Sequence, residues 1–124
     1  LQDCAAHLSK TDGVMLGRAP YKNPYLLASV DAQLFGDADI APSREEVVEG
    51  LIPYAEKLVA NGTPLHALTR HVMGLFQGLP GGRLWRRHLS ENAPRRGDDP
   101  QILREALALV EEQTAKKAAI MESR

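Results

Sequence analysis

Apolar side chains recur every three or four residues over most of this chain, which is the spacing of helices with one buried face. The first such stretch ends near Ser9. A second begins at Asn23-Pro24, where proline suits the first helical turn, and ends at Gly36. We place a domain boundary after Gly36, so that residues 1–36 and residues 37–124 form two units.

The second unit is predicted to be a helical bundle. Its first helix begins at Ser43, whose hydroxyl forms a capping box with Glu46, and ends at Asn61-Gly62. The next two helices are expected over residues 65–77 and 83–92, with a glycine-rich break between them. Asp99 can cap the last helix, whose polar tail from residue 116 is expected to fray.

Each predicted helix of the bundle has an apolar stripe that is expected to face inward. The stripe of the first helix comprises Val47, Leu51, Tyr54, Ala55 and Leu58. The stripe of the second comprises Leu65, Leu68, Val72, Leu75 and Phe76. The third helix carries Leu84, Trp85, His88 and Leu89 on one side. The last helix contributes Ile102, Leu103, Ala106, Leu107 and Val110. The fold class predicted from this pattern is mainly α.

One segment departs from the helical pattern. Val14-Met15-Leu16 is a continuous apolar run between glycines, which is typical of a strand buried on both faces in a parallel sheet. This strand has no partner elsewhere in the sequence. We therefore expect its neighbouring strands to belong to a part of a larger protein that precedes residue 1.

Composition narrows the possible classes of protein. No apolar run reaches the roughly 20 residues that a membrane helix needs, and no secretory signal is apparent, so a cytoplasmic location is expected. The single cysteine, Cys4, excludes an internal disulfide and is expected to be structural. Three histidines lie at positions 66, 71 and 88, but their spacing fits no zinc motif, and we expect no metal.

The net charge of −1 conceals an uneven distribution along the chain. Residues 37–62 lean acidic and carry Asp37, Asp39, Glu45, Glu46, Glu49 and Glu56. Residues 66–96 lean basic and carry Arg70, Arg83, Arg86, Arg87, Arg95 and Arg96. A basic face is therefore possible on a protein whose total charge is almost balanced.

Gly17-Arg18, directly after the predicted strand, is a candidate phosphate site. Glycine lets backbone N–H groups approach an anion, arginine adds charge-assisted hydrogen bonds, and the following helix directs its positive end at the same point. Loops after the last strands of (β/α) barrels often hold a phosphate in this way. The same dipeptide also occurs by chance after apolar triplets, so both interpretations stay open at this point.

Arg83, Arg86 and Arg87 are spaced so that they share one face of a predicted helix, and the preceding Gly81-Gly82 would leave its start open to close approach. Three guanidiniums on one face suit a phosphate backbone or an unstacked base. A solvated charged surface explains the same pattern. Arg70 could extend a basic surface, whereas Trp85 is expected in the core.

Two blocks of residues resemble the tRNA-dihydrouridine synthases. Residues 12–19, DGVMLGRA, followed by Tyr21, Asn23 and Pro24, are similar to the last barrel strand and following helix of that family. Residues 69–71 (TRH), 74–81 (GLFQGLPG) and 85–92 (WRRHLSEN) resemble the helical domain of its A subfamily. Pro20 and Lys22 depart from the family pattern, where alanine and glutamine or histidine are expected.

The resemblance implies a fold and an activity for the parent protein. Residues 1–36 would be the last strand and helix of a flavin-binding (β/α)8 barrel, and residues 37–124 a helical tRNA-binding domain. Members of the family bind FMN and reduce uridine to dihydrouridine in the tRNA D-loop, near positions 20 and 20a for this subfamily, with NADPH as reductant. Gly17 and Arg18 match flavin-phosphate contacts, and Arg83 and Arg86 match subfamily-specific tRNA contacts. Arg87 and Arg70 are further candidates.

The catalytic cysteine of the family lies in a barrel segment that this chain lacks, so the chain alone is expected to be inactive. The alternative is a non-catalytic helical module that binds a protein through an acidic side around Glu45, Glu46 and Glu49. Binding of tRNA that is sensitive to salt and to the loss of Arg83 and Arg86 distinguishes the two hypotheses.

Overall fold

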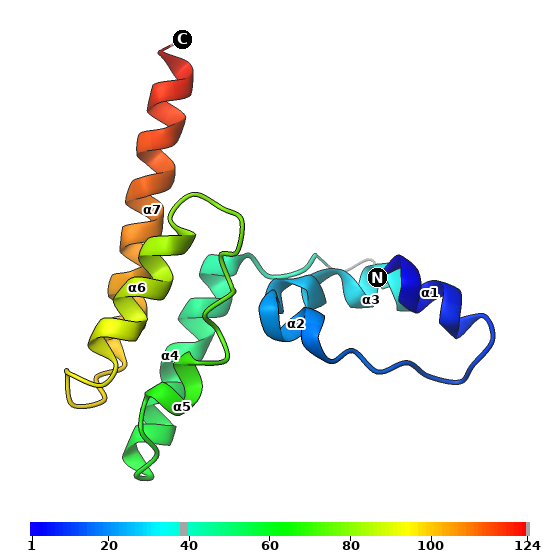
Figure 1. Ribbon diagram of the computed structural model, residues 1–124, viewed down its shortest axis with the longest axis horizontal. Helices are drawn as coiled ribbons and strands as arrows, with labels where there is room; N and C mark the ends of the chain where they lie inside the picture. Colours follow the sequence, from blue (N-terminus) through cyan, green and yellow to red (C-terminus); the bar gives the residue numbers. More distant parts are fainter. Residues whose placement is uncertain (38–39, 124) are drawn as a thin grey trace.

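The protein is built from helices joined by turns and irregular segments. The computed structural model describes residues 1–37 and 40–123, and no β-strand occurs among them. Three helices form a bundle, in which α7 (Gln101–Glu122) packs against both α4 (Arg44–Ala60) and α6 (Gly82–Asn92) (Figure 1). The predicted mainly α class is confirmed. Asp39, one of the acidic residues noted in the sequence, lies outside the described residues.

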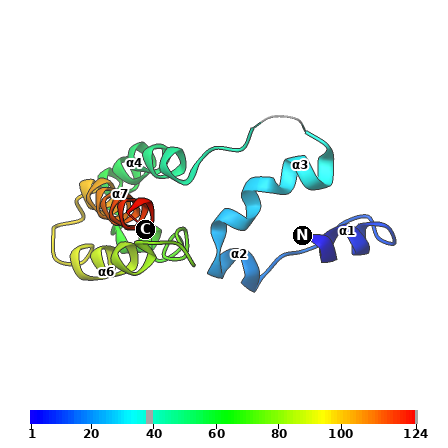
Figure 2. The ribbon, with the colours of Figure 1, turned by 90° about the horizontal axis from the view of Figure 1, so that it is seen from above.

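The first 36 residues extend to one side of this bundle, as both views show (Figure 1, Figure 2). They contain α1 (Gln2–Leu8), the single turn α2 (Arg18–Lys22), the 3-10 helix η1 (Pro24–Ser29) and α3 (Val30–Phe35). The helix predicted from Asn23-Pro24 is thus half 3-10 and half α. It ends as predicted at Gly36, whose φ of +65° is the left-handed conformation that glycine adopts without strain.

The predicted strand at Val14-Met15-Leu16 is wrong for this chain. Residues 13–17 have no regular secondary structure, and the side chains of Val14 and Met15 are 38% and 86% exposed. A strand needs a neighbour with which to exchange backbone hydrogen bonds, and the described residues supply none. Val14 and Met15 are therefore exposed and Leu16 is half-buried, instead of the run being buried on both faces.

Helix α4 begins as the capping box predicts, because the Ser43 hydroxyl accepts a hydrogen bond from the Glu46 amide at 3.1 Å. Its buried face is rotated by about one residue from the predicted stripe. Val48, Ile52 and Ala55 are fully buried, whereas Tyr54 is 54% exposed. The apolar surface of α4 is wide, since Val47, Leu51, Leu58 and Val59 are also packed against the core.

The helix predicted over residues 65–77 is largely absent. Only α5 (His66–Thr69) is helical, and the chain then runs through a series of turns. Two side chains from other elements donate to carbonyls of this segment. Trp85 Nε1 donates to the carbonyl of Val72 at 2.9 Å, and Arg44 Nε donates to that of Leu75 at 2.9 Å. The burial prediction holds better, because Leu65, Leu68, Leu75 and Phe76 are in the core.

The core of the bundle centres on Trp85, which is fully buried as predicted and lies 4.9 Å from Phe76 between ring centroids. The inward stripe of α7 is confirmed at all its positions: Ile102, Leu103, Ala106, Leu107 and Val110. Asp99 Oδ1 accepts a hydrogen bond from the Gln101 amide at 3.0 Å, so the predicted cap is also confirmed. Helix α7 continues to Glu122, so the polar tail from residue 116 is helical over its described part, although residues 111–123 are exposed.

A close joint connects the first 36 residues to the bundle. A Cβ atom built on Gly74 would lie 1.9 Å from the backbone oxygen of Lys22, so these two segments touch where no side chain intervenes. The Arg44 guanidinium lies 3.9 Å from the ring centroid of Tyr25, and the Tyr25 hydroxyl donates to the carbonyl of Pro42 at 2.7 Å. The joint positions α2 beside the turns that follow α5.

Candidate nucleic-acid interface

The glycines before α6 serve packing, which differs from the role expected of them. Gly81 has a φ of +86°, and its Cβ would lie 2.9 Å from the Cα of Val110 on α7. Gly82 is buried, and its Cβ would lie 2.5 Å from the carbonyl oxygen of Phe76. The helix start therefore approaches its own chain closely and is not left open for a ligand.

The three arginines of α6 point to different surroundings. Arg83 is exposed, and no hydrogen bond or ion pair holds its side chain within residues 1–37 and 40–123. Arg87 Nε lies 3.2 Å from Glu91 Oε1, so its charge is partly compensated. Arg86 is half-buried and donates to Gln77 Oε1 at 3.3 Å. Arg83 and Arg86 thus remain available to an anion, whereas Arg87 has a carboxylate of its own.

Arg86 and Arg70, two predicted tRNA contacts, border one hollow of about 320 Å³. Lys22 of α2 borders the same hollow, and sequence reasoning did not include it among the site residues. The remaining lining residues are Tyr21, Asn23, Met73, Gly74 and Gln77. The departure of Lys22 from the family pattern was the one sequence feature that pointed to this residue. Lys22 and Arg70 are far apart along the chain, so the sequence did not show that they border the same hollow.

Two aromatic rings lie beside this hollow. Tyr21 and His71 meet edge to face with 5.9 Å between ring centroids, and His71 Nε2 accepts a hydrogen bond from Arg70 Nε at 3.2 Å. His71 therefore packs against Tyr21 and accepts a hydrogen bond from its neighbour. His88 is likewise engaged, with its Nε2 lying 3.3 Å from Glu105 Oε2.

Gly17 and Arg18 lie at the start of α2. Gly17 precedes the first residue of the helix, and Arg18 is exposed without a side-chain partner among the described residues. Pro20 occupies the first turn, where its missing N–H would have no helical acceptor. The guanidinium and the unpaired N–H groups of Arg18 and Ala19 suit one phosphate group, and Pro20 removes one donor from that set.

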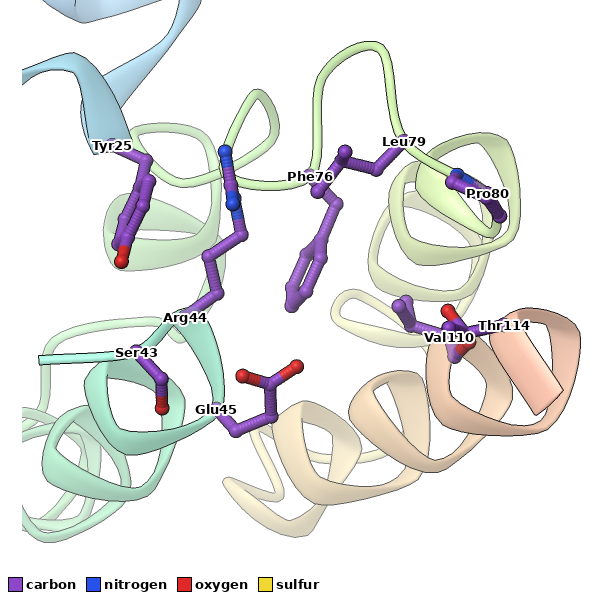
Figure 3. Close-up of a pocket in the computed structure, with 9 residues that line it drawn as sticks. All are labelled: Tyr25, Ser43, Arg44, Glu45, Phe76, Leu79, Pro80, Val110 and Thr114. Carbon is purple, nitrogen blue, oxygen red and sulfur yellow. The ribbon is translucent and has the colours of Figure 1, made fainter. Parts of the chain in front are cut away.

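The acidic residues of the alternative hypothesis lie at the start of α4. Glu49 Oε2 is 3.2 Å from Arg104 on α7. Glu45 borders a hollow of about 260 Å³ between the start of α4, the turn at Leu79-Pro80 and α7, and Figure 3 shows its carboxylate turned toward that space. The Phe76 ring points into the same space (Figure 3). This hollow combines an apolar floor with one acidic group.

Arg96, in the loop after α6, is neutralised by carboxylates. Arg96 donates to Glu105 Oε1 at 2.6 Å and lies 3.2 Å from Asp99. The hydrogen bond from Arg96, helped by one from His88, lowers the pKa of Glu105 from its ordinary value of 4.5. The loop is also tied to α5, because Asp98, which has a φ of +61°, accepts from the Leu65 amide at 2.8 Å.

Two further findings concern other kinds of site. Cys4 is buried on α1, in agreement with the structural role expected of it. Within residues 1–37 and 40–123, no three side chains of His, Cys, Asp or Glu gather as the ligands of a metal ion would. None of the helices in these ranges is both long and apolar enough to cross a membrane.

The sequence of this chain matches a known protein family. Residues 1–119 match the dihydrouridine synthase (Dus) family. The chain is 49% identical over 110 residues to a tRNA-dihydrouridine(20/20a) synthase of Vibrio vulnificus, covering 89% of this chain and 34% of the relative. The proteins of that name from Escherichia coli strain K12 and Shewanella oneidensis are 49% and 47% identical, with 89% and 90% of this chain and 32% and 33% of each relative covered.

The chain spans about a third of the length of these relatives. The family match nevertheless covers nearly all of it, including the segment around Gly17 and the bundle up to residue 119. The predicted resemblance is confirmed, and this chain belongs to the dihydrouridine synthase family.

Proposed function

We propose that this chain is the tRNA-docking part of an enzyme that reduces uridine to dihydrouridine in the tRNA D-loop. The observation that carries the proposal is the set of basic side chains without acidic partners around Arg83, Arg86 and Arg70, in a chain whose relatives bear the name tRNA-dihydrouridine(20/20a) synthase. Arginine suits such a role because its planar fork binds phosphate oxygens in pairs. The site of action would be the cytoplasm, where tRNA is modified.

The role of these side chains is positioning. A base must leave its stack before an enzyme can act on it, and contacts to the RNA backbone hold the remaining nucleotides in place while it does so. Arg83 and Arg86 are the preferred contacts, with Arg70 beside them. Arg87 is the weaker candidate, because Glu91 already lies 3.2 Å from its Nε atom.

We further propose that Gly17 and Arg18 contribute to the phosphate end of an FMN site. Bound FMN supplies hydride transfer from NADPH to the uridine C5–C6 double bond. Arg18 would hold the phosphate through its unpaired guanidinium, with the N–H of Ala19 beside it. In this proposal residues 1–36 form the last strand and helix of a (β/α)8 barrel, and Val14-Met15-Leu16 becomes a strand only beside the other barrel strands. Residues 37–124 form the docking domain.

A titration of tRNA at moderate and high salt tests the docking role. Replacing Arg83 or Arg86 by alanine is expected to weaken binding about tenfold and to reduce the slope of log affinity against log salt by about 1. Lys57→Ala is the matched control, because Lys57 is exposed on α4, borders none of these hollows and carries the same charge. Binding that is absent, or unchanged in both arginine variants, would support the protein-binding alternative around Glu45, Glu46 and Glu49.

Activity of the isolated chain is a separate test. Mixed with tRNA, FMN and NADPH, the chain is expected to form no dihydrouridine, since it supplies no acid for C5 and no wall for the flavin ring among its described residues. Formation of dihydrouridine above the level without protein would contradict the division of roles proposed here.

A further inference from the structure

Three cationic side chains from separate segments border the hollow between α2 and the bundle. Lys22 ends α2, Arg70 follows α5, and Arg86 lies on the second turn of α6. The hollow has a volume of about 320 Å³, which accommodates a phosphate group with part of its ribose. No carboxylate is among its lining residues in the ranges that the structure describes.

The charges of these three side chains are uncompensated. Arg70 donates to an imidazole nitrogen of His71 and Arg86 to the amide oxygen of Gln77, and neither acceptor is an anion. No hydrogen bond or ion pair holds the Lys22 ammonium within residues 1–37 and 40–123.

Three other arginines of the chain differ in this respect. Each of Arg87, Arg96 and Arg104 lies within 3.2 Å of a carboxylate oxygen. Arg18 and Arg83 are also unpaired among the described residues, but neither borders this hollow, where three unpaired cations gather.

The grouping is maintained by the close joint at Gly74. Any side chain at this position would collide with the backbone of Lys22, so only glycine lets α2 approach the turns after α5 closely enough for Lys22 to border the hollow. Like charges held together repel each other, and one anion between them removes that cost. A phosphate of a polynucleotide provides such an anion and accepts several charge-assisted hydrogen bonds at once.

We propose that Lys22, Arg70 and Arg86 together bind a single backbone phosphate of the RNA. The inference rests on the proposed tRNA-docking function and extends it, because it assigns Lys22 a role and joins residues of both units in one subsite. In this arrangement the phosphate bridges α2, which belongs to residues 1–36, and the bundle. The RNA would then bind best when the two units keep their observed arrangement.

A salt titration of tRNA binding with single and double variants tests the shared phosphate. Lys22→Gln is expected to weaken binding about fivefold to tenfold and to reduce the salt slope by about 1, whereas Lys57→Gln leaves both unchanged. The double variant Lys22→Gln/Arg86→Gln is expected to lose less than the product of the two single losses, because both side chains hold the same group. Lys22→Gln binding like Lys57→Gln, or a double loss equal to the product, would overturn the proposal.

A titration with small probes, followed by amide and arginine side-chain NMR signals, separates this proposal from the broader function. Uridine 5′-monophosphate is expected to shift the signals of Gly74 and of the Arg86 side chain, uridine to leave them in place, and Lys22→Gln to abolish the shifts. Equal shifts with uridine, or shifts retained in Lys22→Gln, would overturn the phosphate site.

The source of the phosphate is decided by the same signals. FMN could shift these signals at lower concentration than uridine monophosphate does, while Lys22→Gln leaves tRNA binding unaffected. That result would overturn the assignment of the hollow to an RNA phosphate, in favour of the flavin phosphate. Shifts with uridine monophosphate in a chain that binds no tRNA would refute the docking function and leave the phosphate hollow standing.

Discussion

At three positions of this chain, neighbouring backbone lies so close that only glycine fits. Gly74 contacts the backbone of Lys22, Gly82 contacts the carbonyl of Phe76, and Gly81 contacts Val110. Gly81 alone among them also has a positive φ, so a side chain there would be strained by both its backbone and its neighbour. Sequence inspection treats Gly81 and Gly82 as a break between helices, and the structure shows that they also let α6 pack on α7.

Gly81→Ala is expected to lower the free energy of unfolding by about 3 kcal/mol, since left-handed strain adds to the overlap with the Val110 backbone. Gly62→Ala is the matched control, because Gly62 has a φ of +89° and a Cβ atom there would meet nothing within 4 Å. The control is expected to lose about 1–2 kcal/mol from backbone strain alone. Urea unfolding measures both, and equal losses would show that the contact with Val110 contributes nothing.

The contact between Arg96 and Glu105 predicts a dependence of stability on pH. Hydrogen bonds from Arg96 and His88 lower the pKa of Glu105 below 4.5, so its contribution is present above that value and is lost as the pH falls through the folded-state pKa. Glu105→Gln is expected to flatten the fall of Tm between about pH 6 and about pH 3. Glu56→Gln, an exposed carboxylate on α4, is the control, and an equal flattening there would contradict the assignment.

At the scale of elements, side chains determine the path of residues 70–80 as much as the backbone does. The stripe of apolar residues predicts a helix through Gln77, but the chain leaves helical geometry after α5. The Trp85 indole and the Arg44 guanidinium each donate to a carbonyl of this segment, and successive turns bury the apolar side chains. A buried stripe therefore does not by itself establish a helix.

Trp85→Phe tests the indole hydrogen bond. The phenyl ring keeps the apolar contact with Phe76 but leaves the carbonyl of Val72 without its donor, which is expected to cost about 1–3 kcal/mol of folding free energy. Hydrogen exchange is expected to accelerate most in residues 70–80. Tyr54→Phe, at a ring that is 54% exposed, is the control and should change neither measurement. Uniform acceleration over α7 and residues 70–80 would refute this local role.

At the scale of the whole molecule, the joint at Gly74 couples two parts of different character. The bundle has a continuous core around Trp85, whereas large apolar side chains of the first 40 residues lie exposed, including Met15, Tyr21, Phe35 and Ile40. The approach of Lys22 to Gly74 and the stacking of Arg44 on Tyr25 are two contacts that join the parts. Loss of either contact should loosen the first part before the bundle.

Gly74→Ala is expected to displace α2, because the new methyl group would overlap the Lys22 carbonyl. Hydrogen exchange should accelerate in residues 18–30 while α4, α6 and α7 keep their protection. Gly50→Ala is the control, since a Cβ there meets nothing within 4 Å and alanine favours the helix by up to about 1 kcal/mol. Global loss of protection in Gly74→Ala, or none in residues 18–30, would contradict this coupling.

The sequence alone determined the helices α4, α6 and α7, the caps at Ser43 and Asp99, and the inward residues of α7, because these depend on local hydrogen bonds and on a repeat of three to four residues. Its two motif blocks also determined the family. Tertiary structure decided the rest. Val14-Met15-Leu16 has no neighbouring strand among the described residues, and the carbonyls of Val72 and Leu75 accept from distant side chains. Lys22 borders the same hollow as Arg70 and Arg86, which are 48 and 64 positions away in the sequence. Such contacts depend on how distant segments pack, which no local pattern encodes.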